Sequence, residues 1–231
     1  WARFSPGQAD LLRALRERLG PEVVARLLEA GYNLDFFDDA ALEQVARVEK
    51  DALALGGHRY RIVVLPGVET IPLETLRKLE QFARRGGILV ATRRLPAGAP
   101  GLKAAEAEQR EVREISRRLF EGPSAPGHFV QDENRDLGSR LVGLWRPDVS
   151  LSPAAPEVGF VHRSADSAEI YFLANTGNLR WSGKATFRVD GREAEWWDPL
   201  TGRALPAAIV GRESGSTTVA LELDPYGSRV L

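Results

Sequence analysis

The sequence contains no cysteine and no methionine, and its only histidines are His58, His128 and His162. Without cysteine the chain can form no disulfide, no thiol nucleophile and no zinc site built on thiolates. The three histidines are far apart in the sequence and have none of the spacings of metal ligands. The sequence therefore predicts neither a metal site nor a cofactor.

An excess of charge of one sign is also lacking, because 31 basic and 32 acidic residues are interspersed along the chain. This balance argues against nucleic acid or an anionic membrane as a partner. No apolar run approaches the length of a membrane span. The chain begins at Trp1 without an initiator methionine. We therefore expect a piece of a longer protein, whose localisation stays open, with a secreted or periplasmic parent as one expectation.

The clearest local pattern is a strand, a helix and a second strand. Residues 61–65 and 88–92 are continuous apolar runs, typical of strands buried on both faces. Residues 73–85 between them place Leu76, Leu79 and Phe82 at helical spacing. Because short loops join these elements, they predict a right-handed crossover in a parallel sheet.

Further elements are predicted around this unit from the period of the apolar residues. Helices are expected over residues 8–19, 21–30, 40–48, 104–120 and 137–145, and a strand over residues 32–37. Asp38 suits the N-cap of the helix over 40–48, and Gly31 the C-cap of the helix over 21–30.

Beyond Asp148 the apolar period changes from helical to two. Strands are expected over residues 169–175, 183–189, 193–198 and 217–223, with Gly, Asn and Pro between them. Their spacing is typical of a compact antiparallel β-sandwich. The sequence thus predicts an α/β domain over residues 1–147 and a β-sandwich over residues 148–231.

Several sequence segments resemble those of known protein families. The segments YRIVVLPGVETIP (60–72), GGILVAT (86–92) and RLP (94–96) resemble the glutamine-amidotransferase-like domain attached to several glycoside hydrolases. The segments FVHR (160–163), IYFLAN (170–175), WDP (197–199) with TG (201–202), and PYGS (225–228) resemble the C-terminal part of the α-L-rhamnosidases of glycoside hydrolase family 106. The resemblance covers nearly the whole chain.

This resemblance implies a flavodoxin-like, amidotransferase-like parallel sheet with flanking helices, followed by the sandwich. It also implies a non-catalytic accessory or scaffolding piece of a bacterial glycoside hydrolase, whose catalytic carboxylates lie in an upstream (β/α)-barrel. That barrel would be the main partner, and carbohydrate a further one. Two alternatives stay open: a carbohydrate-binding module that acts through an exposed tryptophan, and an oligomerisation domain of the β-galactosidase type.

Five residues are candidate contacts to sugar or between domains: Glu69, His162, Arg163, Trp196 and Trp197. Glu69 follows a parallel strand, where α/β domains commonly place ligands, although a surface loop is the plainer interpretation. His162 and Arg163 would join the two domains through an acidic partner or contact sugar. Trp196 and Trp197 must point to opposite faces of a strand, so one is expected in the core.

No catalytic residue is predicted. An amidotransferase needs a cysteine at a strand-to-helix turn, and here Arg93 and Arg94 follow the second apolar strand. Glycoside hydrolysis needs two carboxyl groups that face each other across the scissile bond, and no such pair is indicated. The acidic residues Asp35, Asp38 and Asp39 lack the glycine and glutamate of a calcium loop, which favours helix capping.

Overall fold

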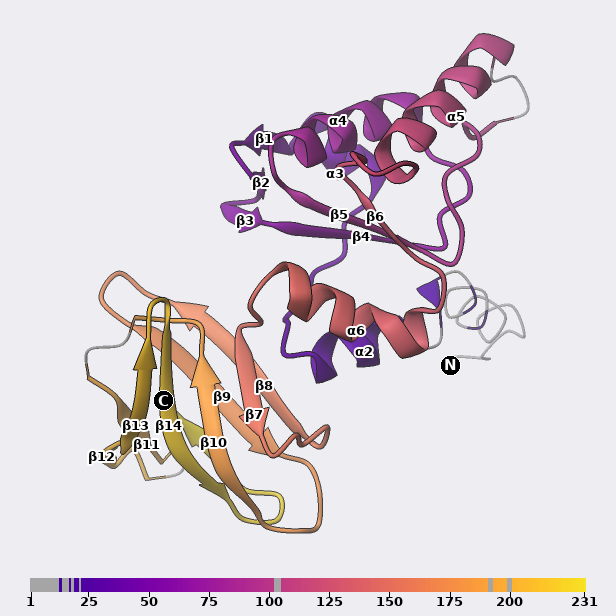
Figure 1. The fold of residues 1–231 in the computed structure, drawn as a ribbon. Coiled ribbons are helices and arrows are strands. Elements are labelled where there is room, and N and C mark those ends of the chain that lie inside the picture. The colour runs from indigo at the N-terminus through magenta and orange to yellow at the C-terminus, as the bar shows by residue number, and fades with distance from the viewer. Residues whose placement is uncertain are drawn as a thin grey trace, which may run out of the picture. The chain divides into compact units, whose positions relative to one another are not determined.

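The computed structural model describes residues 13, 17, 19, 20, 22–101, 105–190, 193–198 and 201–231. The chain divides into two compact units (Figure 1). The first comprises Trp1–Val24 and Asp35–Arg140, and the second comprises Ala25–Leu34 and Leu141–Leu231. The second unit therefore includes a short segment from early in the chain. The division between residues 147 and 148 stays a prediction.

The helices are α2 (Val23–Glu29), α3 (Asp39–Gln44), α4 (Leu73–Arg84), α5 (Glu106–Phe120) and α6 (Glu133–Leu144). The strands up to the end of the first unit are β1 (Arg47–Glu49), β2 (Ala52–Leu55), β3 (His58–Tyr60), β4 (Ile62–Pro66), β5 (Ile88–Thr92) and β6 (His128–Val130). The remaining strands are β7 (Val149–Ser152), β8 (Val158–Ser164), β9 (Glu169–Asn175), β10 (Trp181–Phe187), β11 (Glu195–Trp197), β12 (Ala204–Pro206), β13 (Ile209–Glu213), β14 (Ser216–Leu223) and β15 (Ser228–Val230).

The first unit contains a parallel sheet in the order β4–β5–β6. Helix α4 connects β4 to β5, which confirms the predicted parallel pair. The face of α4 that was expected to point inward, including Leu76, Leu79 and Phe82, is fully buried. Helix α4 ends where Gly86 adopts φ 93° and Gly87 donates to the carbonyl of Phe82. Left-handed backbone at this place favours glycine, so the Gly-Gly pair ends the helix.

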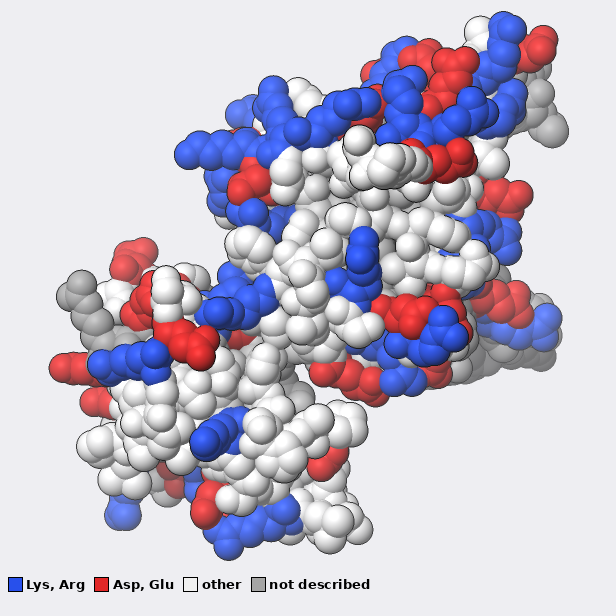
Figure 2. Space-filling model, in the orientation of Figure 1, with Lys and Arg blue, Asp and Glu red and all other residues white. Residues whose placement is uncertain are grey.

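Helices α4 and α5 lie together on one face of the parallel sheet (Figure 1). Their apolar sides join one core, in which Val112, Ile115 and Leu119 of α5 are buried. Their outer sides carry interleaved charges (Figure 2). Arg77 of α4 pairs with Glu111 of α5 at 2.5 Å, and Arg118 of α5 pairs with Glu80 of α4 at 3.1 Å. These ion pairs therefore connect the two helices on their solvent-facing side.

Two predictions near the start of the first unit differ from the structure, one of them only in its second half. Residues 32–37 form no strand, because Tyr32 completes the C-terminal turn of α2 and Asp38 already caps α3. The helix predicted over residues 40–48 ends at Gln44. Beyond it, β1 and β2 form an antiparallel ladder that pairs Val48 with the fully buried Leu53. The apolar residues of this segment are spaced as in a helix, but strand pairing in the β1–β2 hairpin places Val48 against the core instead.

Other predicted helices are confirmed with shifted ends. The helix over 21–30 is α2, and Gly31 follows it with φ 85° as the predicted C-cap. The helix over 104–120 is α5 and starts at Glu106, and the helix over 137–145 is α6 and starts earlier, at Glu133. The helix over residues 8–19 lies outside the described residues, apart from Arg13, Glu17 and Leu19.

The second unit is a β-sandwich of two antiparallel sheets. One sheet has the order β13–β14–β10–β7 and the other β12–β11–β15–β9–β8. The four predicted strands correspond to β9, β10, β11 and β14. Side chains from both sheets form one core, which includes Phe187, Leu221, Tyr171 and Leu173. The structure therefore has the expected organisation, with helices and a parallel sheet in the first unit and antiparallel sheets in the second.

Candidate functional site

The carboxyl ends of parallel strands are where α/β domains commonly bind ligands. At this edge of the first unit, Arg93 directly follows β5 with φ 62°, a conformation that few non-glycine residues adopt. Its guanidinium lies against Gly67, where an added Cβ would come within 2.6 Å of Nη2. Nη2 also donates to the carbonyl of Pro66 at 3.2 Å. The Arg93 side chain therefore covers the end of β4.

Arg93 also forms an ion pair with Glu133, the first residue of α6, at 3.1 Å. The Glu133 side chain is only 4% exposed and accepts a hydrogen bond from Oγ1 of Thr92 at 2.7 Å. A strained turn after a central strand is where a nucleophile would stand in an amidotransferase-type site. Here that position holds a cation, Arg93, bound to a buried carboxylate.

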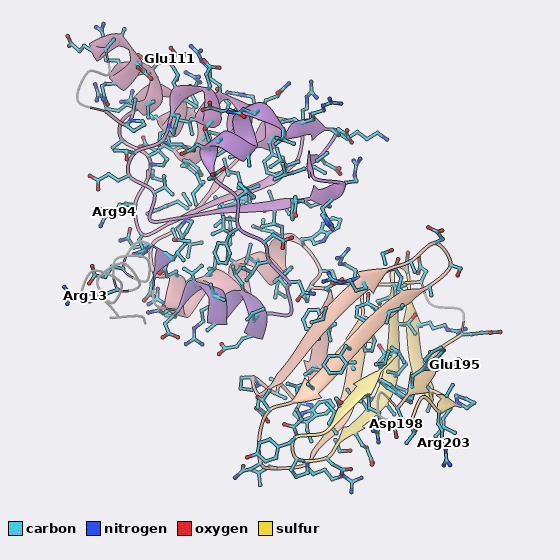
Figure 3. All side chains as sticks on the ribbon, turned by 180° about the vertical axis from the view of Figure 1, so that it is seen from behind. Arg13, Arg94, Glu111, Glu195, Asp198 and Arg203 are labelled. Atoms are coloured by element: carbon cyan, nitrogen blue, oxygen red, sulfur yellow. The ribbon has the colours of Figure 1, made fainter. Side chains whose placement is uncertain are left out.

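Glu69 lies in the loop that follows β4 and is paired with Arg94. The carboxylate and the guanidinium are 2.7 Å apart, and both side chains are more than half exposed. Arg94 extends outward from this part of the first unit in Figure 3. The structure thus brings Glu69 next to a cation, and a contact between Glu69 and sugar stays a prediction.

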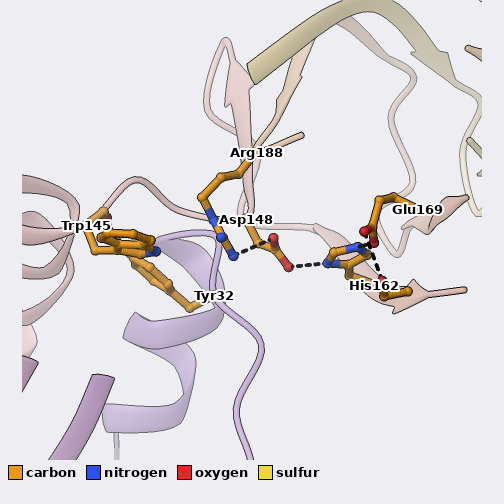
Figure 4. A network of polar contacts seen from close by, with 7 residues as sticks. Tyr32, Trp145, Asp148, His162, Glu169 and Arg188 are labelled. Atoms are coloured by element: carbon orange, nitrogen blue, oxygen red, sulfur yellow. Dashed lines mark hydrogen bonds and ion pairs between the residues drawn. The ribbon is translucent and has the colours of Figure 1, made fainter. Parts of the chain in front are cut away.

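A network of polar side chains in the second unit is centred on Asp148 (Figure 4). Asp148 precedes β7, and its carboxylate accepts from Nδ1 of His162 on β8 at 2.9 Å and from Arg188, which follows β10, at 2.9 Å. Nε2 of His162 donates to Glu169 on β9 at 2.7 Å. Since β7 and β10 belong to one sheet and β8 and β9 to the other, the network joins the two sheets of the sandwich.

Two carboxylates favour the charged form of the His162 imidazole. Burial of the ring opposes protonation, but the hydrogen bonds and charges of Asp148, followed by those of Glu169, outweigh it. They raise the pKa of His162 above its ordinary value of 6.5. When both ring nitrogens donate to these carboxylates, the imidazolium has no free lone pair to act as a general base. The ring also fills the space between the two carboxylates, so they cannot face each other across a glycosidic bond.

Aromatic rings attach this network to the core. Tyr171 is 1% exposed, and its ring stacks on that of His162 with centroids 4.0 Å apart. The ring of Tyr171 also packs against that of Phe187, with centroids 4.6 Å apart. The guanidinium of Arg188 lies 5.8 Å from the ring centre of Trp145. The cluster therefore consists of paired charged groups that lie against Tyr171 and Phe187 of the core.

The other predicted residues are placed differently. Arg163 is exposed on β8, next to the network but on the opposite face of its sheet from His162. Trp196 packs against the core of the second unit, whereas Trp197 is 51% exposed. One tryptophan is therefore in the core, as the alternation of a strand requires. The roles predicted for His162, Arg163 and the tryptophans in sugar or domain contacts stay predictions, and both acidic partners of His162 belong to the second unit.

Three members of the network were not predicted from the sequence: Asp148, Glu169 and Arg188. They lie up to 40 positions apart, and no local motif links them.

The acidic cluster near α3 behaves as expected, since Asp38 caps the helix through Ala41 at 2.8 Å and Asp35 accepts from the hydroxyl of Tyr60. Within the described residues, no group of three or more His, Asp or Glu side chains is arranged to hold a metal ion. None of the helices described is long and apolar enough to cross a bilayer.

Known proteins with a similar architecture are carbohydrate-active enzymes. A rhamnosidase from Novosphingobium sp. PP1Y is 26% identical with a TM-score of 0.69, over 85% of this chain and 19% of its own. A family 42 β-galactosidase from G. stearothermophilus is 13% identical with a TM-score of 0.53, over 90% of this chain and 35% of its own, and shares the fold. A protein of Formosa agariphila provisionally named a β-glucuronidase is 25% identical over 87% of this chain and 17% of its own length.

All three of these proteins are named as glycoside hydrolases. The family model of the α-L-rhamnosidases of glycoside hydrolase family 106 matches residues 22–209, and the chain belongs to that family. It spans less than one fifth of the length of the rhamnosidase and of the Formosa protein.

Proposed function

We propose that this chain is a non-catalytic accessory and scaffolding segment of a longer α-L-rhamnosidase-like enzyme. The observation that carries the proposal is the coverage: 85% of this chain corresponds to only 19% of the Novosphingobium rhamnosidase. The two polar clusters agree with this role. In each of them the charged groups pair with one another, around Glu133 in the first unit and around Asp148 in the second.

The proposal extends to the ancestry of the first unit. A parallel sheet, helices packed on its face and a strained residue after β5 are features that an amidotransferase-like or flavodoxin-like domain would have. With Arg93 in place of a nucleophile, such a domain would keep its fold and lose its chemistry. Residues 1–147 would form this domain, and residues 148–231 the sandwich.

The partner of this segment would be the catalytic domain of the same longer protein. Hydrolysis of a rhamnoside requires two carboxyl groups separated by room for the sugar or for water. Asp148 and Glu169 do not provide that room, because His162 lies between them and bonds to both. The acid and the base or nucleophile would therefore come from a (β/α)-barrel that precedes this segment. An oligomerisation role stays a prediction.

The scaffolding role can be tested in the longer protein by weakening the sandwich. Asp148→Ala removes the shared partner of His162 and Arg188. It is expected to shorten the half-life of rhamnosidase activity at elevated temperature and to leave KM unchanged. Asp166→Ala, which removes an exposed carboxylate of the same unit, is the matched control and is expected to change neither quantity. A change of KM or kcat by Asp148→Ala in fully folded enzyme would contradict a scaffolding role.

A further inference from the structure

The solvent face of the five-stranded sheet carries a continuous row of apolar side chains. In the register of the strands, Trp197 of β11 is opposite Ala204 of β12 and opposite Val230 of β15. Val230 is in turn opposite Phe172 of β9, and Phe172 is opposite Val161 of β8. Directly paired residues point to the same side of a sheet. Each of the five strands therefore contributes one apolar side chain to a single row.

This row faces outward. Trp197, Val161 and Phe172 are 51%, 43% and 39% exposed, whereas the residues next to Phe172, Tyr171 and Leu173, are buried in the core. An antiparallel sheet with one face on the core normally carries polar side chains on the other face. A contiguous exposed apolar patch in such a place commonly marks an interaction surface.

The tryptophan of the row is held in a fixed orientation. Its indole Nε1 donates to the carboxylate of Glu195 at 3.2 Å. Glu195 precedes it by two positions on β11, so both side chains lie on the same face, and Glu195 is labelled on this part of the molecule in Figure 3. A ring that is oriented before binding loses less conformational entropy when a ligand stacks on it.

The exposed area and the charge of the row limit the kinds of ligand that suit it. Its side chains expose on the order of 300–400 Å², given about 150–250 Å² for a fully exposed aromatic side chain. A stable protein interface needs about 800 Å² from each partner. The row itself has no ionisable group, and the flanking charges Glu195 and Arg163 are of opposite sign. The row is therefore too small to hold a second copy of the chain stably. A charged ligand would gain no net electrostatic attraction from it.

We propose that this face is a binding site for a short neutral oligosaccharide, with Trp197 and Phe172 as stacking platforms. The row crosses four strand intervals, about 19 Å at about 4.8 Å each, which accommodates several sugar rings in line. The exposed carboxylate of Glu195 and guanidinium of Arg163 would bond sugar hydroxyls at the sides. Only the choice of L-rhamnose as the test sugar rests on the proposed function.

The test is a titration of the purified 231-residue chain with a linear L-rhamnotetraose, by calorimetry and by tryptophan fluorescence. We expect saturable binding with a dissociation constant of about 1 mM or lower. Trp197→Ala is expected to raise this constant about tenfold or more, and Phe172→Ala to raise it as well. Tyr226→Asn removes a 74% exposed aromatic ring that lies outside the row, at a positive φ that Asn tolerates, and is expected to leave binding unchanged.

Circular dichroism of each variant shows that the fold is retained. The proposal is overturned if the wild-type chain does not bind, or if folded Trp197→Ala binds as well as the wild type. It is also overturned if Tyr226→Asn loses binding to the same degree, or if light scattering shows a wild-type dimer that Trp197→Ala dissolves. Failure here would leave the scaffolding role intact, because that role is tested by the thermal half-life of activity and involves no sugar binding by this chain.

Discussion

The imidazole of His162 stacks on the phenol ring of Tyr171, with the ring planes 10° apart. Tyr171 belongs to the core of the sandwich, and His162 binds the carboxylates of Asp148 and Glu169. The stack therefore places an ionisable group directly on an apolar core. Because the carboxylates compensate the charge, the stability of the second unit should depend on the protonation of this one ring.

His162→Gln tests that dependence. A group whose pKa is raised in the folded state stabilises fully below its unfolded pKa of about 6.5, and this stabilisation is lost as pH rises through the folded pKa. The unfolding free energy of the wild type should therefore fall as pH rises above about 6.5. The variant should be less stable at pH 6, by about 1–3 kcal/mol, and should lack this fall. Urea unfolding followed by tryptophan fluorescence measures it, since four of the five tryptophans lie in the second unit.

His128 supplies a control of opposite sign in the first unit. Burial, followed by the charge of Arg140, lowers the pKa of His128. The unfolded state then binds a proton more readily, so this group costs stability as pH falls below about 6.5. His128→Gln should make the first unit less sensitive to acid, as followed by ellipticity at 222 nm. Equal pH profiles of the wild type and both variants would contradict this account of the two histidines.

Two ion pairs at the edge of the parallel sheet should differ strongly in their contribution to stability. Glu133→Ala leaves the partly buried guanidinium of Arg93 without its carboxylate, and should cost about 2–4 kcal/mol. Glu69→Ala breaks an exposed pair with Arg94 and should cost no more than about 0.5 kcal/mol. Urea unfolding followed at 222 nm compares the two variants. A similar small loss in both would show that Arg93 does not depend on Glu133.

The adjacent tryptophans of β11 should respond in opposite ways to truncation. Trp196 packs against the core of the sandwich, so Trp196→Ala should destabilise the second unit by about 2–4 kcal/mol. Trp197 lies on the outer face, so Trp197→Ala should change stability by no more than about 0.5 kcal/mol. Thermal unfolding of the two variants provides the comparison, and a larger loss in Trp197→Ala would mean that the faces of β11 are assigned the wrong way round.

Asn175 should be the most sensitive polar residue at the end of the sandwich. Its buried amide donates to the carbonyls of Leu179 at 2.8 Å and Asp224 at 3.1 Å, and accepts from the Gly177 N–H at 2.9 Å. Asn175→Ala leaves these groups without their partner and should cost about 2–3 kcal/mol. The exposed Asn178 gives the control, because Asn178→Ala should be neutral in the same unfolding measurement. Equal stability of both variants would refute this role.

The parts of the fold that the sequence predicts are those with a long, clear period. The apolar runs of β4 and β5 and the alternation of β9 and β14 are strong signals over five to eight residues. Strands β1, β2 and β3 have only three or four residues each, too few for a reliable period. A usable signal was nevertheless present, since Gly56 and Gly57 both adopt positive φ in the turn between β2 and β3.

The candidate site depended on information that the sequence does not carry locally. His162 was singled out, but its partners Asp148 and Glu169 meet it only after the two sheets have packed on each other. The outer row likewise depends on strand register, which pairs Phe172 of β9 with Val230 of β15, 58 positions later in the chain. Alternation alone shows that one of Trp196 and Trp197 is outside, and only burial shows that it is Trp197.

We propose that this chain has no hydrolytic activity of its own. The direct measurement is the release of 4-nitrophenol from 4-nitrophenyl α-L-rhamnoside by the purified 231-residue chain, with circular dichroism to show that it is folded. The account predicts a rate no higher than that of the buffer blank at any protein concentration. Release that increases in proportion to the chain, and that persists through repeated purification, would contradict it.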